Sequence, residues 1–284
     1  MRNAFMKISG FTIARNIEKY RYPAVESIHS ILPICDEFII NIGESEDNTR
    51  KILGGIDNPK IRLMDTQWDF SMGKEVLSFQ TNLALQECRG DWAFYLQLDE
   101  VIHEHDLARL VKCMRTYLNQ DVDALRFKWL HFYGSYYRYR IDKGWYQKQD
   151  RIIRNNGQVE SIGDAFGFGR KDGGPLKRKE THCLLYHYGW VQPEDVMLQR
   201  RLNACDIGFV ELDEATANGQ FRYGDLKRFP AYFGSHPMVM QGHIREHSVS
   251  QADKKMIDRT YWWHPLKCLR IRYKTGQRVK QNIQ

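Results

Sequence analysis

Several features that would assign this chain to a specialised class are missing from its sequence. No apolar run approaches the roughly 18 residues that a membrane-spanning helix needs, and the first residues include no long apolar stretch of the secretory type. The six cysteines are scattered and form no C-x-x-C pair, which argues against a zinc knuckle or a disulfide framework. With 284 residues and 42% hydrophobic content, one substantial core is possible, and we expect a globular, cytoplasmic protein.

Acidic residues are absent from the last part of the chain. From Arg259 to Gln284 there are seven basic residues and no acid, so the net charge of +7 lies in this tail. Cations contribute about 1 kcal/mol each near an anionic membrane surface, so the tail could attach the protein peripherally to the inner face of the plasma membrane. A solvated terminus is the alternative. No nucleic-acid-binding motif accompanies the charge, and we expect no nucleic-acid partner.

Apolar runs alternate with amphipathic segments along the chain. The pattern predicts strands over residues 7–14, 37–42, 60–65, 123–132 and 149–154, and helices over residues 22–32, 74–88, 103–118 and 194–207. Alternation of strands and helices through residue 118 favours an α/β fold with a parallel, doubly wound sheet.

One further apolar run ends in two adjacent carboxylates, Asp99 and Glu100. The hydrophobic side chains of residues 94–98 need burial, whereas neither acid can be buried unpaired. The acids therefore belong at the C-terminal edge of a strand, where α/β enzymes bind ligands. Carboxylate oxygens in such a position suit Mg²⁺ or Mn²⁺, ions that usually accompany phosphate. The alternative is that Asp99 begins a loop and Glu100 caps the helix that follows.

A polar segment between Tyr133 and Tyr146 is unusually rich in tyrosine and also contains Trp145. It is too aromatic for a solvated loop. Aromatic rings stack on the apolar faces of sugars and offer polar tips to hydroxyl groups, so the segment indicates a carbohydrate-acceptor surface. Packing within the fold is the alternative for each ring.

Short motifs occur in a recognisable order along residues 7–190. They are Thr12-Ile13-Ala14-Arg15-Asn16-Ile17-Glu18, Asp36-Glu37 with Ser45-Glu46-Asp47-Asn48-Thr49, Gly90-Asp91-Trp92, Leu96-Gln97-Leu98-Asp99-Glu100, and Arg151-Ile152-Ile153-Arg154 with Asp164. This order resembles family 2 glycosyltransferases of the GT-A fold, especially bacterial enzymes of lipopolysaccharide or capsule synthesis. The resemblance implies a Rossmann-like, mostly parallel sheet flanked by helices in a catalytic domain over residues 1–190, and a helical, basic extension over residues 191–284.

The resemblance also implies an activity and the residues that perform it. The expected reaction moves a sugar from a nucleotide-sugar donor to a saccharide or lipid-linked acceptor, with inversion at the anomeric carbon. Asp164 matches the catalytic base, and Asp99 and His187 match ligands of Mg²⁺ or Mn²⁺; an Asx turn and a structural histidine are the alternatives at 164 and 187. Substrate contacts are expected from Thr12, Arg15, Asn16, Glu44, Asn82, Gln97, Glu100, Trp145 and Arg151.

Two positions depart from the family pattern. Ile42 stands where an acid usually contacts the nucleotide base, and Gln97 replaces the first acid of the metal motif. Glutamine supplies hydrogen bonds but no charge, so metal dependence is expected to be weak or dispensable. A degenerate, non-catalytic module that binds a glycan or nucleotide and scaffolds a polysaccharide-assembly complex is therefore the alternative. A nucleotidyltransferase is disfavoured because residues 7–16 lack a Gly-rich, Lys-containing phosphate loop.

Overall fold

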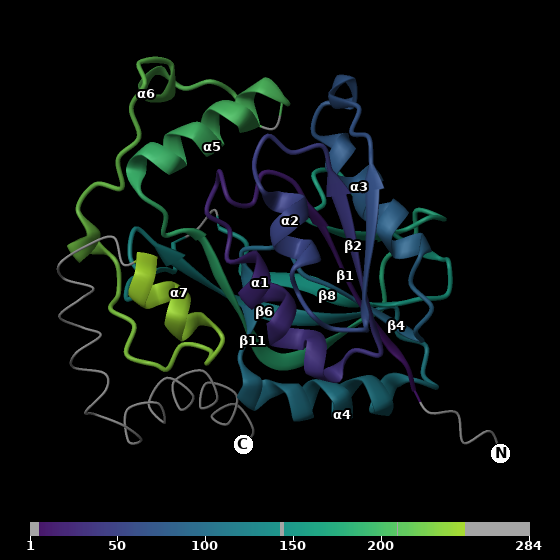
Figure 1. The fold of residues 1–284 in the computed structure, drawn as a ribbon. Helices are drawn as coiled ribbons and strands as arrows, with labels where there is room; N and C mark the ends of the chain where they lie inside the picture. Colours follow the sequence, from purple (N-terminus) through teal and green to yellow (C-terminus); the bar gives the residue numbers. More distant parts are fainter. Residues whose placement is uncertain (1–5, 143–144, 209, 248–284) are drawn as a thin grey trace.

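The structure, a computed structural model, describes residues 6–142, 145–208 and 210–247. The basic tail that the sequence suggests as a membrane contact lies outside these residues. A nine-stranded sheet crosses the described part of the chain in the order β3-β2-β1-β4-β8-β6-β11-β5, with β7 (Tyr139–Arg140) paired to β6 (Figure 1). Within that part, no helix is long and apolar enough to cross a membrane.

The first half of the sheet is parallel, as expected. It consists of β1 (Ile8–Ala14), β2 (Glu37–Gly43), β3 (Ile61–Thr66) and β4 (Trp92–Tyr95). The connections contain α1 (Ala24–Ile31), α2 (Thr49–Gly54) and α3 (Glu75–Gln86). The predicted strands match these within about two residues, because strands covered on both faces read as continuous apolar runs.

The second half of the sheet mixes strand directions. It contains β8 (Lys148–Arg154), β6 (Ala124–Tyr133), β11 (Arg178–Trp190) and the short β5 (Glu100–Ile102). The β6–β11 pair is parallel, whereas the β4–β8, β8–β6 and β11–β5 pairs are antiparallel. The sheet is therefore mixed, and the doubly wound, parallel arrangement holds only for the first half.

Side chains of the central strands alternate between two cores on opposite faces of the sheet. On β4, Trp92 and Phe94 pack with α1 and with α4 (Leu107–Tyr117), whereas Ala93 and Tyr95 pack with α3. The second core also contains residues of a hairpin formed by β9 (Val159–Ile162) and β10 (Gly167–Arg170). The hairpin therefore lies on the α3 face, and its turn contains Asp164.

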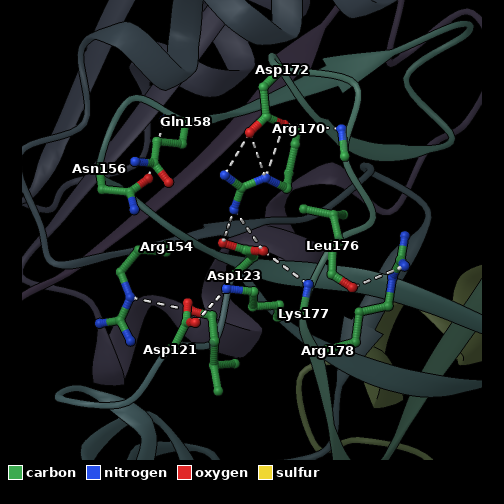
Figure 2. Close-up of polar contacts among 12 residues, drawn as sticks. Asp121, Asp123, Arg154, Asn156, Gln158, Arg170, Asp172, Leu176, Lys177 and Arg178 are labelled. Atoms are coloured by element: carbon green, nitrogen blue, oxygen red, sulfur yellow. Dashed lines mark hydrogen bonds and ion pairs between the residues drawn. The ribbon is translucent and has the colours of Figure 1, made fainter.

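Ion pairs fasten this hairpin to the start of β6 (Figure 2). Buried Asp123 accepts hydrogen bonds from the guanidinium of Arg170 at 3.1 and 3.2 Å and from the backbone N–H of Lys177 at 2.8 Å. Arg170 also donates to Asp172 at 2.8 Å. Charge-assisted bonds of this kind are stronger than neutral ones, so the far end of β10 is held firmly against the sheet.

The chain after the sheet contains a helix where residues 194–207 predict one, and it returns over the carboxyl ends of the parallel strands (Figure 1). α5 (Glu194–Asp206) is followed by the short α6 (Glu214–Ala217) and by α7 (Met240–His247). Side chains of α5 share a cavity with residues at the ends of β1 and β4. The predicted boundary at residues 190 and 191 therefore separates chain segments that contribute to one site.

Candidate active site

A cavity of about 360 Å³ lies where the ends of β1 and β4 face α5. One group of lining residues, which we call the aromatic wall, is apolar and mostly aromatic and includes Ile13, Trp68, Phe70, Leu77 and Tyr95. The polar part of the lining has two carboxylates, three guanidinium groups and one imidazole. A site of this size, with an apolar wall and a few convergent polar groups, is typical of small-molecule binding.

Asp99 lies in the turn between β4 and β5 and faces this cavity with 7% of its surface exposed. Its Oδ2 atom is 3.3 Å from Nη2 of Arg200 and 3.7 Å from Nε2 of His187. The backbone of Asp99 is fixed by the N–H of Tyr188, which donates to its carbonyl at 2.7 Å. A Cβ atom at Gly189 would lie 2.5 Å from Oδ2, so only glycine leaves room for this carboxylate.

Sequence reasoning missed two cations that line the cavity, Arg200 and Arg201 of α5, of which Arg200 contacts Asp99. It donates through Nη1 to the carbonyl of Gly189 at 2.7 Å, and its guanidinium carbon lies 4.4 Å from the centre of the Tyr22 ring. These contacts fix the guanidinium beside Asp99. The sequence gives no signal for this role, because Arg200 belongs to a polar helix outside every recognised motif.

His187 of β11 lines the cavity and contacts a second histidine behind it. Its Nδ1 atom is 3.0 Å from Nδ1 of His131, and Nε2 of His131 is 2.8 Å from the carbonyl oxygen of Tyr146. Trp129 stacks on the His187 ring with centroids 5.2 Å apart. Burial lowers the pKa of His187 from its usual 6.5. The pKa of His131 is lowered to about 3, first by burial and then by the neighbouring His187.

Asp164 also lines the cavity, in the tight turn of the β9–β10 hairpin. Its Oδ1 accepts a hydrogen bond from the N–H of Phe166 at 3.1 Å. Asp164 therefore forms the Asx turn that was the alternative for this residue, and its side chain also lines the cavity. The turn has two residues at positive φ, Gly163 at 60° and Ala165 at 59°. It therefore needs support from its surroundings.

Three of the predicted substrate contacts make hydrogen bonds that support this hairpin. The side-chain amide of Asn82 bonds to both backbone groups of Ser161, at 2.7 and 3.0 Å. Gln97 donates to the carbonyl of Ala165 at 3.3 Å, and Arg151 donates to that of Phe166 at 2.9 Å. Of the three supporting side chains, only Gln97 also lines the cavity.

Glu100 and Arg151 form a fully buried, bidentate ion pair, with N–O distances of 2.7 and 2.8 Å. Neither residue lines the cavity. Since each charge compensates the other inside the protein, breaking the pair would leave a buried charge uncompensated. Glu100 and Arg151 were expected to bind substrate, but in the structure they have a structural role.

Of the contacts predicted at residues 12–16, only Arg15 reaches the cavity. Arg15 lines it, with Nε donating to the carbonyl of Glu44 at 3.0 Å and its guanidinium 4.6 Å from the centre of the Phe70 ring. The other predicted contacts in this loop are directed inward: Thr12 donates to the carbonyl of Leu96 at 2.6 Å, and the Asn16 side chain accepts from the backbone of residue 46 at 2.8 Å. Neither Thr12, Asn16 nor Glu44 lines the cavity.

Trp145 packs within an aromatic cluster beside the cavity. Its ring centre lies 5.3 Å from that of Trp190 and 6.0 Å from that of Tyr133, with the Arg140 guanidinium 4.6 Å away. Only Trp190 of these residues lines the cavity. Packing thus accounts for most of this aromatic segment.

Asp99 and His187 offer one oxygen and one nitrogen ligand for a divalent ion, 3.7 Å apart and facing one cavity. This donor set fits an ion that takes its other ligands from substrate phosphates. A second group, His103, Glu104 and His105, is the only cluster of three potential ligands among the described residues. Its two imidazoles stack at 4.3 Å with planes 21° apart, so their in-plane lone pairs do not converge on one ion.

No family model matches the chain, and no curated protein does either. Among solved structures, S. aureus TarS is similar with a TM-score of 0.43 and 19% identity, over 74% of this chain and 41% of that one. S. aureus TarS 1-349 in complex with UDP-GlcNAc has a TM-score of 0.41 and 18% identity, over 74% of this chain and 69% of that one. A mycobacterial protein has a TM-score of 0.40 and 14% identity, over 80% of this chain and 83% of that one. This chain spans about two-fifths of the first structure's length, and likeness at this level assigns no activity.

Proposed function

We propose that the protein is a GT-A-type glycosyltransferase that moves a sugar from a nucleoside-diphosphate donor to a hydroxyl of a saccharide or lipid-linked acceptor, with inversion, in surface-polysaccharide synthesis. One observation carries the proposal: Asp99, Asp164 and His187, from three separate parts of the chain, line a single cavity. Two carboxylates that share a cavity with cations at the ends of the parallel strands fit a reaction in which a diphosphate leaves and a proton is removed.

The polar part of the cavity suits the diphosphate. The cavity is lined by three positive charges and two negative ones. The positive charges belong to Arg15, Arg200 and Arg201, and the negative charges to Asp99 and Asp164. Guanidinium groups form paired, charge-assisted hydrogen bonds with phosphate oxygens. Because Arg200 already lies beside Asp99, it brings positive charge to this point even without a metal ion.

The aromatic wall suits the nucleoside. Trp68 and Phe70 offer apolar faces on which a base can stack. The indole Nε1 of Trp68 is buried against Gly43 at the end of β2 and has no hydrogen-bond partner among the described residues.

Mg²⁺ or Mn²⁺ fits the pair formed by Asp99 and His187. Such an ion would supply charge neutralisation at the departing diphosphate. Asp164 then performs the proton transfer: its carboxylate takes the proton of the acceptor hydroxyl as the oxygen forms the new bond to the anomeric carbon. The bond from that carbon to the diphosphate oxygen breaks, and the diphosphate leaves with the electron pair.

Replacement of Asp164 by asparagine tests this role. The asparagine side chain keeps the oxygen that accepts from Phe166 and therefore the turn, but it cannot take a proton. We expect kcat of Asp164→Asn to fall about 10²–10⁴-fold while the Kd of the donor changes little. Donor binding is measured by calorimetry and turnover by release of the nucleoside diphosphate.

The matched control is Asp65→Asn, which alters an exposed carboxylate on β3 outside the cavity and the hairpin. It should keep normal turnover. A wild-type protein that binds a donor but never transfers its sugar would instead favour the non-catalytic module.

A further inference from the structure

His131 and His187 are register partners on the adjacent strands β6 and β11, and both are buried. Their rings are nearly perpendicular, with interplanar angle 80°, and their Nδ1 atoms are 3.0 Å apart. One of these two nitrogens must donate a proton and the other must accept it. The rest of the network decides which.

The carbonyl oxygen of Tyr146 determines which of the two Nδ1 atoms carries the proton. A carbonyl oxygen only accepts hydrogen bonds, so Nε2 of His131, 2.8 Å away, must carry a proton. Buried His131 is uncharged, because desolvation disfavours the imidazolium, and its Nδ1 atom is therefore bare. The proton between the rings consequently belongs to Nδ1 of His187.

We propose that His131 is a positioning residue that fixes His187 as the Nδ1–H tautomer, so that the lone pair of His187 Nε2 faces the cavity beside Asp99. The chain of contacts runs from the Tyr146 carbonyl through His131 to His187. In water, histidine favours the opposite tautomer, so this arrangement is imposed by the protein. The inference rests on the proposed function only in treating His187 as a ligand.

No hydrogen bond is formed between Nε2 and the nearest carboxylate. The Oδ2 atom of Asp99 lies 3.7 Å from Nε2, beyond hydrogen-bond distance, and accepts instead from Nη2 of Arg200 at 3.3 Å. A bare Nε2 nitrogen is consistent with this arrangement. Gly189 keeps the space open, since a Cβ there would lie 2.8 Å from Nε2 of His187. Metal-binding histidines commonly have their second nitrogen engaged in this way.

The tautomer can be measured directly. In protein labelled with ¹⁵N-histidine, two-bond ¹H–¹⁵N correlation spectra at neutral pH distinguish a ring protonated at Nδ1 from one protonated at Nε2. The His187 signals are identified by their loss in His187→Gln. We expect the wild-type ring to show the Nδ1–H pattern; an Nε2–H pattern in the wild type would overturn the proposal without any further variant.

Two substitutions at residue 131 test the cause. Phenylalanine removes the acceptor, and we expect His187 to revert to the Nε2–H pattern; asparagine restores an acceptor oxygen and should restore the Nδ1–H pattern. The matched control is Trp129→Phe, which alters the ring stacked on His187 but leaves the hydrogen bond intact. An unchanged Nδ1–H pattern in His131→Phe would contradict a positioning role.

Mn²⁺ separates this inference from the proposed function. Titrated Mn²⁺ should broaden the His187 signals, and His131→Phe should raise its Kd about 10–100-fold. If Mn²⁺ leaves these signals unaffected while the Nδ1–H pattern holds, the metal site of the proposed function fails and the tautomer assignment stands. If Mn²⁺ binds equally well to His131→Phe, the positioning role fails and the metal site stands.

Discussion

At the scale of single residues, the polar cavity combines side chains that lie far apart in the sequence. Asp99, Asp164 and His187 were predicted as site residues from short motifs, and the fold brings all three to one cavity. Glu100 and Arg151 were predicted as well, but they neutralise each other in the interior. A motif gives the residue type and the approximate place; it does not say whether a charged side chain finds its partner in the substrate or in the protein.

Gly189 gives a residue-scale prediction. A methyl group at this position would lie 2.5 Å from Asp99 Oδ2 and 2.8 Å from His187 Nε2, so both side chains must move. We expect Gly189→Ala to lower kcat/KM about 10–100-fold and stability by about 1–3 kcal/mol, the usual cost of overpacking. Steady-state kinetics and urea unfolding measure the two effects.

Gly242→Ala is the matched control, because no atom lies within 4 Å of the added methyl group in α7. It should leave kcat/KM unchanged and stabilise the helix by up to about 1 kcal/mol. Equal kinetics for the two alanine variants would argue against the packed arrangement at Gly189.

At the scale of elements, the sequence predicts the first strands well and the later ones poorly. β2 has a near-continuous apolar run and β1 and β3 are short segments rich in apolar residues, whereas β11 begins with the charged residues of positions 178–180 and has no clear period. The β9–β10 hairpin is absent from the predicted strands, and its second strand is the short segment Gly167–Arg170, with two glycines. That hairpin carries Asp164, so the geometry of the proposed base depended on tertiary contacts that no local pattern reveals.

Asn82 gives an element-scale prediction. Its side chain makes both hydrogen bonds that attach Ser161 of β9 to α3. Because Asn82→Ala removes both, the hairpin loosens and Asp164 is held less well. We expect kcat to fall about 10-fold with little change in donor Kd, and stability to fall by about 1–3 kcal/mol.

The control is Asn156→Ala, an exposed position whose bond to Gln158 is local. It should behave like the wild type in kinetics and in thermal unfolding. A donor Kd that rises in Asn82→Ala while kcat holds would instead favour direct substrate binding by this residue.

At the scale of the whole molecule, an α/β fold with a helical C-terminal part was predictable, and the mixed second half of the sheet was not. Antiparallel and parallel strands share the same apolar character, so strand direction follows from connections rather than from composition. Arg200 illustrates the same limit: α5 was predicted, but its return across the strand ends brings a cation to Asp99 that no motif contains.

Buried histidines make global stability depend on pH. Burial lowers the pKa of His243 from 6.5 to about 4 and that of His131 to about 3. Between 6.5 and these values the unfolded chain binds protons that the folded protein excludes, so stability falls as pH falls. Each group contributes up to about 1.4 kcal/mol per pH unit in this window.

His243→Gln should therefore reduce the slope of unfolding free energy against pH between about 6.5 and 4 by up to about 1.4 kcal/mol per unit. Urea unfolding at a series of pH values measures the slope. An identical slope in the variant and the wild type would show that His243 is protonated in the folded protein.

The most direct test of the account is the rate of nucleoside-diphosphate release across a panel of nucleotide sugars, for the wild type, Asp99→Asn and the exposed control Asp65→Asn. The account predicts that the wild type and the control consume at least one donor, and that Asp99→Asn is at least about 100-fold slower although it remains folded. Wild-type rates in Asp99→Asn, or no donor consumed by the wild type, would contradict it.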